Sequence, residues 1–163
     1  DGKGFMIQDP TATEYGGLFV FDEGVNSVAV GDQVTVSGIY EEYYDLTEIT
    51  DASVTVSGTA PVPAPIVIAD PCTIATKGAD AEKYESMLLV LENVSVSDAN
   101  PDDPDDFGEF EVGGCLRVDD WLCDDCWDPQ PAQGTTYSEL IGPLTYTFGN
   151  FKLVPRTSAD LIK

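Results

Sequence analysis

The clearest structural signal in the sequence is Gln33-Val34-Thr35-Val36-Ser37-Gly38-Ile39-Tyr40, in which apolar and polar side chains alternate. A period of two is typical of a β-strand that buries one face. Short apolar runs separated by Gly, Pro and Asp lie on both sides of it. These runs are 4–8, 17–21, 25–31, 44–49 and 53–57. The first part of the chain is therefore predicted to be all β.

The rest of the chain shows the same kind of pattern after a boundary. Residues 58–65 alternate with proline, which makes a stiff, extended linker. Only 79–85 has the composition of a helix, and it is short. The predicted strands that follow are 87–96, 107–112, 115–118, 135–147 and 151–154. The second part is also predicted to be all β.

The two parts repeat one another. Gly17-Leu18-Phe19-Val20 matches Cys115-Leu116-Arg117-Val118, and Gly38-Ile39-Tyr40 matches Gly142-Pro143-Leu144. A glycine inside a long strand marks a sharp bend of a small barrel. Gly4-Phe5-Met6-Ile7 likewise matches the segment 108–112, and 46–49 matches 151–154. Because the matching segments follow in the same order in both parts, the sequence predicts two copies of one unit.

A resemblance to a known family rests on residues 4–10, 17–20, 28–34, 36–38 and Leu46-Thr47, with a looser match at 89–94 and 148–153. These segments resemble the OB-fold modules of large secreted bacterial proteins, many of which also carry an endonuclease/exonuclease/phosphatase domain. The resemblance implies a five-stranded barrel with an accessory role. We expect an all-β chain of two tandem OB-like barrels: 1–60 is the first, 61–86 is a proline-rich linker with a short helix, and 87–163 is the second.

The first copy is predicted to lack its own first strand. In the second copy Met87–Val96 precedes the Phe107–Val112 strand, whereas only Asp1, Gly2 and Lys3 precede the edge residues Gly4, Phe5, Met6, Ile7 and Gln8. An unpaired edge and an open slot are unfavourable. Two explanations stay open. A fragment or processing boundary removed the strand, or another copy or a neighbouring domain adds one. A head-to-tail contact that does not close would build a filament.

Charge and composition exclude several classes of function. The chain has 30 acids, 7 bases and no histidine, so it lacks an imidazole for acid–base catalysis or zinc binding. Between Lys3 and Lys77 there is no basic residue, which makes nucleic acid an unlikely partner. No run of 18 apolar residues exists, so no membrane span is predicted.

The chain has four cysteines, which are Cys72, Cys115, Cys123 and Cys126. They could form a zinc site, a redox pair or disulfides. The spacing supplies only one C-x-x-C pair, which disfavours zinc, and no βαβ unit supports a redox motif. Two structural disulfides in an extracellular, secreted protein fit better. Cys123 is expected to pair with Cys115 or with Cys126.

Two kinds of candidate site remain. The oxygen-rich loop of Asp98, Asn100, Asp102, Asp103, Asp105 and Asp106 offers ligands for calcium, and 119–128 is a second acidic cluster; a solvated acidic loop is the alternative. Aromatic side chains gather at the hairpin between the last two strands of each copy, where they can face a ligand or close the barrel. They are Tyr40, Tyr43 and Tyr44 in the first copy, and Tyr146, Phe148 and Phe151 in the second.

These patterns together predict a secreted, non-catalytic module that joins copies or partners by β-strand addition, with an extracellular filament as the outcome. The alternative is a substrate-binding accessory region of a secreted nuclease or phosphodiesterase. A hydrolase would need a metal and carboxylates alone, and thirty scattered acids single out no pair.

Overall fold

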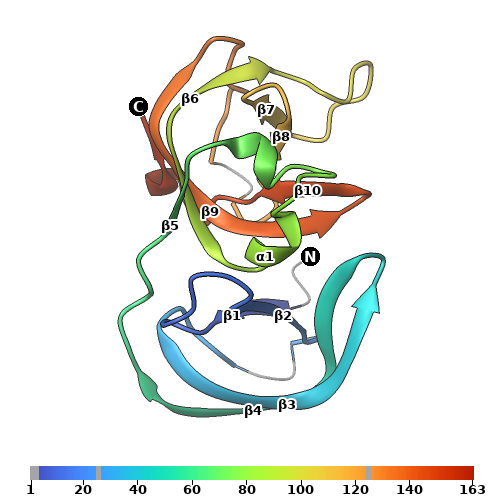
Figure 1. The fold of residues 1–163 in the computed structure, drawn as a ribbon, viewed down its shortest axis with the longest axis vertical. Coiled ribbons are helices and arrows are strands. Elements are labelled where there is room, and N and C mark those ends of the chain that lie inside the picture. Colours follow the sequence, from blue (N-terminus) through green and yellow to red (C-terminus); the bar gives the residue numbers. More distant parts are fainter. Residues whose placement is uncertain (1–3, 25–26, 124–125) are drawn as a thin grey trace.

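The computed structural model describes residues 4–24, 27–123 and 126–163, and within them the chain is almost entirely β (Figure 1). The strands are β1 (Gly4–Gln8), β2 (Gly17–Phe21), β3 (Asp32–Tyr43), β4 (Leu46–Thr59), β5 (Ile66–Ile68), β6 (Leu88–Asp98), β7 (Phe110–Val112), β8 (Leu116–Val118), β9 (Thr136–Thr147), β10 (Asn150–Leu153) and β11 (Leu161–Ile162). The helix α1 (Ala81–Tyr84) and two 3-10 turns, Pro71–Thr73 and Ser158–Asp160, complete the elements.

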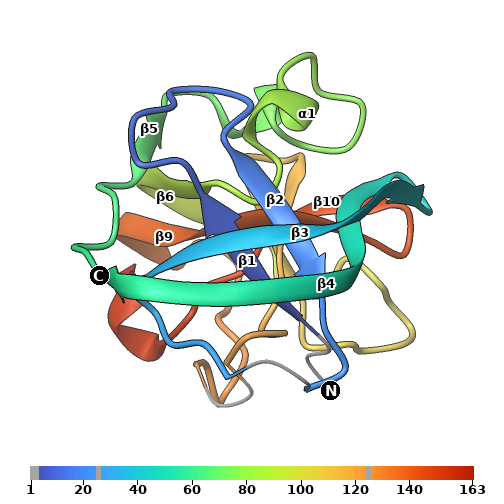
Figure 2. The ribbon, with the colours of Figure 1, turned by 90° about the horizontal axis from the view of Figure 1, so that it is seen from below.

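The N-terminal sheet, here called the first barrel, has four strands in the order β1-β2-β4-β3. β1 and β2 are antiparallel, β2 and β4 are parallel, and β3 and β4 form a long antiparallel hairpin. Figures 1 and 2 show that the β3–β4 ribbon bends across β1 and β2, which lie between this ribbon and the rest of the molecule.

The C-terminal sheet contains the second barrel, made of β6 to β10. Its order β7-β8-β10-β9 repeats the order of the first sheet, with the same parallel pair in the middle. β6 then pairs antiparallel with β9 along one half and with β7 along the other. This one strand closes the sheet into a five-stranded barrel. β5 and β11 extend the sheet at the outer edges of β6 and β9.

The register of the strands makes the two copies comparable residue by residue. Val20 pairs with Ile49, which pairs with Tyr40; Val118 pairs with Leu153, which pairs with Leu144. Tyr40 is thus the counterpart of Leu144. The sequence match of 46–49 with 151–154 was one residue out of register, because Ile49 corresponds to Leu153.

The glycine predicted to bend each long strand stands at the same position in both barrels. A Cβ on Gly38 would lie 2.4 Å from Ile49 Cγ2 and 2.5 Å from Thr50 O, and a Cβ on Gly142 would lie 2.7 Å from the carbonyl of Val154. Backbone and side chain therefore approach too closely for any other residue at either site.

Two sequence-based strand predictions were wrong. Residues 27–31 have no regular structure, and the predicted residues 25 and 26 lie outside the described part of the chain. The predicted strands 44–49 and 53–57 are one strand, β4, which begins at Leu46 after a turn at 44 and 45. Asp51, with φ +48°, lies where the register of β4 against β3 shifts, so an irregularity within one strand produced the break in the sequence pattern.

The main hydrophobic core lies inside the second barrel. It joins Leu89, Phe110, Leu116, Leu140 and Leu144. The segment after the linker packs onto it as well, through Ile68, Ile74, Ala75 and Ala81. In the first barrel the buried apolar side chains among the described residues are only Phe19, Val20 and Leu46. The two copies share a topology but not a core.

Candidate functional site: the open seam of the first barrel

The first barrel has an open seam between β1 and β3. Within residues 4–24, 27–123 and 126–163, β1 pairs only with β2, and β3 pairs only with β4. Their counterparts β7 and β9 both pair with β6. The outer edges of β1 and β3 therefore carry backbone N–H and C=O groups that can accept a strand.

The open seam exposes side chains that the second barrel buries. Leu144 is fully buried, whereas its counterpart Tyr40 is 65 % exposed. Leu140, four residues before Leu144, is also fully buried, but Val36, four residues before Tyr40, is only half-buried. The exposed apolar face is what a further strand would cover.

The strand β6 defines what fits such a seam. It has eleven residues and runs antiparallel to β9 and β7, the counterparts of β3 and β1. Leu89, Leu91 and Val96 point into the core. By correspondence, a strand in the seam of the first barrel would run antiparallel to β3 and β1, with apolar side chains at alternate inward positions.

The predicted assembly edge, Gly4, Phe5, Met6, Ile7 and Gln8, is the strand β1. All five residues are half-buried. Gln8 lies at the end nearer to the second barrel, where its side-chain oxygen accepts a hydrogen bond from Leu88 N–H at 2.9 Å. One edge of β1 is held by β2, and the other is unpaired within the described residues.

The predicted ligand-facing aromatic residues separate into two groups. Tyr43 and Tyr44 are exposed and pack edge to face with ring centroids 4.7 Å apart, and Phe148 is 97 % exposed. Phe151, in contrast, is 5 % exposed and belongs to the core, with Tyr146 packed on it. Phe151 was therefore misassigned as ligand-facing, because it is an inward residue of β10.

The predicted calcium loop connects β6 and β7, and much of its bonding capacity is used within the protein. The carboxylate of Asp102 accepts hydrogen bonds from Arg117 at 2.7 and 2.8 Å. Asp98 accepts from the Asn100 N–H, and Asp106 from the Gly108 N–H. No group of three or more acidic or cysteine side chains within the described residues is arranged to hold a metal. Calcium binding by this loop stays a prediction, and residues 124 and 125 of the second acidic cluster lie outside the described residues.

A network of charged side chains lies beside this loop, on the outside of β8 and β10. Arg117 also contacts Glu109 at 2.8 Å, and the buried Lys152 contacts Glu109 and, at 2.9 Å, Asp119. These two cations face carboxylates of their own chain. Such pairing leaves them poorly placed to contact phosphate groups.

The four cysteines form two disulfides, Cys72–Cys115 and Cys123–Cys126. The first joins the turn Pro71–Thr73 to the start of β8, 43 residues further along the chain. The second pairing is one of the two alternatives that the sequence left open for Cys123. Both disulfides lie outside the first barrel.

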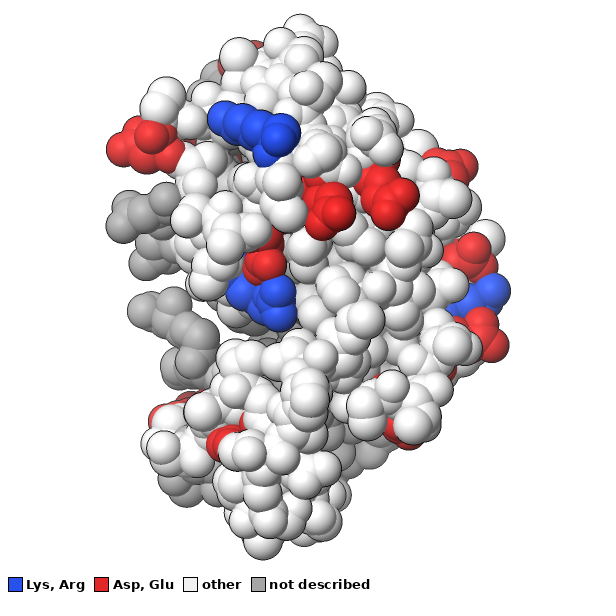
Figure 3. All heavy atoms as spheres, turned by 90° about the vertical axis from the view of Figure 1, so that its left-hand side faces the viewer, with Lys and Arg blue, Asp and Glu red and all other residues white. Residues whose placement is uncertain are grey.

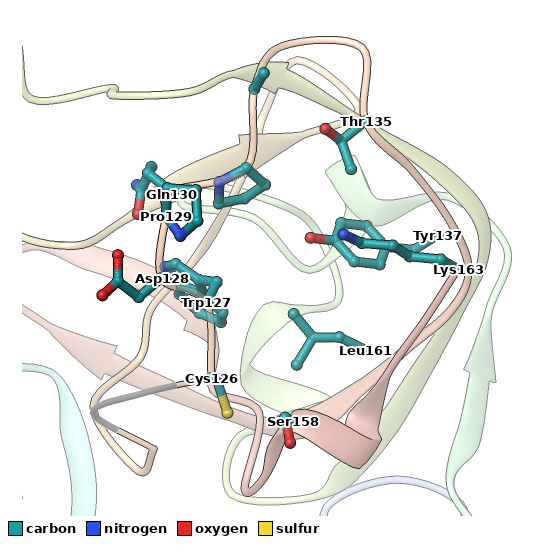
Figure 4. Close-up of a pocket in the computed structure, with 12 residues that line it drawn as sticks. Cys126, Trp127, Asp128, Pro129, Gln130, Thr135, Tyr137, Ser158, Leu161 and Lys163 are labelled. Carbon is teal, nitrogen blue, oxygen red and sulfur yellow. The ribbon is translucent and has the colours of Figure 1, made fainter.

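A pocket of about 570 Å³ opens at one end of the second barrel (Figure 4). Trp127, Tyr137 and Leu161 supply apolar surface, and Ser158 and Thr135 supply hydroxyl groups. The indole N–H of Trp127 donates to Gly108 O at 3.0 Å, which fixes the ring. No local sequence pattern indicates this pocket, since its walls come from 126–137 and the distant 158–163.

The junction of the two barrels is held by specific contacts. Thr47 N–H donates to Glu85 Oε2 at 3.0 Å, Tyr15 N–H donates to Lys83 O at 2.6 Å, and the rings of Phe19 and Trp121 lie 6.3 Å apart. Glu85 is buried, and its Oε1 has no hydrogen-bond partner among the described residues. Burial raises the pKa of Glu85 to about 7, with a further contribution from nearby carboxylates.

Comparisons with known proteins give no relative: no family model, no curated protein and no solved structure matches this chain. Among the described residues, no helix is long and apolar enough to cross a membrane. The function is therefore argued from the geometry of the seam.

Proposed function

We propose that this chain is a secreted, extracellular, non-catalytic structural module that joins copies of itself by β-strand addition. The observation that carries the proposal is the contrast between β1 and β3, whose outer edges are unpaired within the described residues, and β7 and β9, which β6 joins. A supplied strand would satisfy backbone groups and cover apolar surface at once.

The two disulfides support the extracellular assignment, because such bonds persist in oxidising compartments. A contact between the seam of one copy and a strand of the next is head to tail, and its repetition without ring closure builds a filament.

The test is assembly of the purified chain, followed by sedimentation and negative-stain microscopy over a range of concentrations. The informative variant carries a second copy of Leu88–Asp98 and its following loop, fused before β1 so that the first barrel can close within one molecule. We expect polymers from the wild-type chain and monomers from this fusion. A fusion with the same residues in scrambled order is the matched control and should still polymerise. A wild-type chain that stays monomeric at all concentrations contradicts the proposal.

The alternative from another class is a substrate-binding accessory region. The exposed Phe148 and the pocket beside Trp127 favour it, since aromatic surfaces of this kind stack on sugars or peptides. It predicts a monomer that binds soluble glycans or peptides. Loss of that binding in a Trp127→Ala variant, with Phe148→Ala as a comparison, would locate the site.

A further inference from the structure

The β3–β4 ribbon contains the same five residues twice. Val34-Thr35-Val36-Ser37-Gly38 lies in β3, and Val54-Thr55-Val56-Ser57-Gly58 lies in β4. The two copies pair with each other in antiparallel register, with Val34 opposite Val56, Thr35 opposite Thr55 and Val36 opposite Val54. Within one chain, therefore, two copies of this pentapeptide form an antiparallel strand pair.

The pairing places four valines on one face of the ribbon, the face that corresponds to the inside of the barrel. Val34, Val36 and Val54 are half-buried, and Val56 is 46 % exposed. Cross-strand valine pairs of this kind stabilise a sheet most when a further strand or layer covers them. This apolar face is only partly covered within the molecule.

Both outer edges of the ribbon are accessible within the described residues. β3 pairs only with β4, so its other edge faces the seam. β4 pairs with β2 only at Glu48 and Ile49, so its other edge is unpaired from Thr50 to Thr59. The counterpart strand β10 ends after four residues, so this extension of β4 has no equivalent in the second barrel.

The part of the ribbon that contains the two pentapeptides also lacks the charges that normally keep strand edges apart. Residues 33–40 and 52–69 contain no charged side chain, in a chain with 30 acids. The face of the molecule that carries the end of β4 and the following linker is largely uncharged in its lower part (Figure 3). Charged side chains on edge strands are a common defence against association, and short segments of high β-propensity without charge favour it.

Resting on the proposed function, we infer that the strand accepted by β3 is the β4 extension of a second copy, so that one Val-Thr-Val-Ser-Gly segment pairs with the other across the contact. The geometry repeats the antiparallel pair already present inside each chain. Because one edge of the ribbon meets the opposite edge of the next ribbon, the contact is head to tail and propagates. The high negative charge makes assembly stronger as salt increases, since screening weakens repulsion between copies.

The first test uses a synthetic peptide with the sequence of residues 52–60, which is uncharged and contains the β4 pentapeptide. Its matched control has the same composition with Val and Thr exchanged in order. We expect the peptide, and not its control, to shorten the polymers and to protect the backbone amides of 34–38 from hydrogen exchange. A peptide with the sequence of Leu88–Asp98 is tested in parallel. Both peptides can enter the seam under the proposed function, but binding of the Leu88–Asp98 peptide together with failure of the 52–60 peptide to bind would overturn the inference.

The second test uses the variant Val56→Lys, which places a charge on the apolar face, and Thr55→Lys, which places the same charge on the opposite face of the same strand. We expect Val56→Lys to raise the concentration needed for assembly about tenfold or more, and Thr55→Lys to change it less. Far-UV and near-UV circular dichroism of both variants checks that the fold is kept. Polymers that form equally well with Val56→Lys, and whose protected amides lie outside 34–38, overturn the inference but leave the proposed function in place. Absence of polymers at every salt concentration overturns both.

Discussion

The two barrels have the same strand order but differ in one strand, and this difference accounts for most of the contrast between them. In the second barrel β6 joins β9 to β7, and inward residues such as Leu140 and Leu144 are fully buried. In the first barrel the equivalent edges remain unpaired within the described residues, and Tyr40 stands exposed. A shared topology therefore does not ensure a shared core. In the proposed assembly, the closed barrel is the stable platform and the open barrel presents the surface for association.

The largest effect on stability is expected from removing a disulfide, because both disulfides lie outside the first barrel. Replacing Cys72 and Cys115 by Ser should lower the free energy of unfolding of the second barrel by about 4 kcal/mol, from the entropy of a loop of 43 residues. Replacing Cys123 and Cys126 should lower it by only about 2 kcal/mol, since that loop is short. Urea unfolding followed by tryptophan fluorescence measures both. Equal losses in the two double variants would contradict this ranking.

A pair of equivalent core positions tests the difference between the barrels directly. Leu144→Ala should lower the free energy of unfolding by about 3 kcal/mol, because it leaves a cavity in a closed core. Tyr40→Ala should change it by less than about 0.5 kcal/mol in the unassembled chain, because the side chain is exposed. Thermal and urea unfolding of the monomer provide the measurement. A large loss in Tyr40→Ala would mean that the first barrel is closed in solution.

A smaller effect is expected at the junction between the barrels, where Glu85 is buried. Its pKa of about 7 in the folded chain lies above the usual 4.5, so folding favours the protonated form. Stability should therefore fall as pH rises from about 4.5 to about 7, by at most about 3 kcal/mol. Glu85→Gln should remove this loss and be more stable than the wild type at pH 8, with little difference near pH 4. Parallel pH profiles for the two proteins would show that Glu85 does not cause the dependence.

Much of the fold could be predicted from the sequence, because alternation along the strands and the repeat around Gly38 and Gly142 are local signals. The sequence repeat also indicated a difference at the start of the first copy, where the outer edges of β1 and β3 are unpaired within the described residues. The sequence did not indicate that β4 continues through the irregularity near Asp51. A break in the alternation of apolar and polar residues looks the same as the end of a strand.

The site was less predictable than the fold. The acidic composition of 98–106 predicts a calcium site, yet the carboxylate of Asp102 accepts a hydrogen bond from Arg117. That contact joins distant segments and has no local signal. Phe151 was grouped with exposed aromatic residues because the sequence places it near a hairpin, but its inward direction depends on the register of β10. The Glu85 environment arises from the packing of two barrels and has no local signature.

The most direct test of the central claim is amide hydrogen exchange of β1 and β3 in the dilute monomer and in the assembled protein, with β7 and β9 as internal references. We predict that the outer-edge amides of β1 and β3 exchange fast in the monomer and become protected on assembly, whereas β7 and β9 are protected in both. Protection of β1 and β3 already in the monomer, unchanged by assembly, would contradict the account.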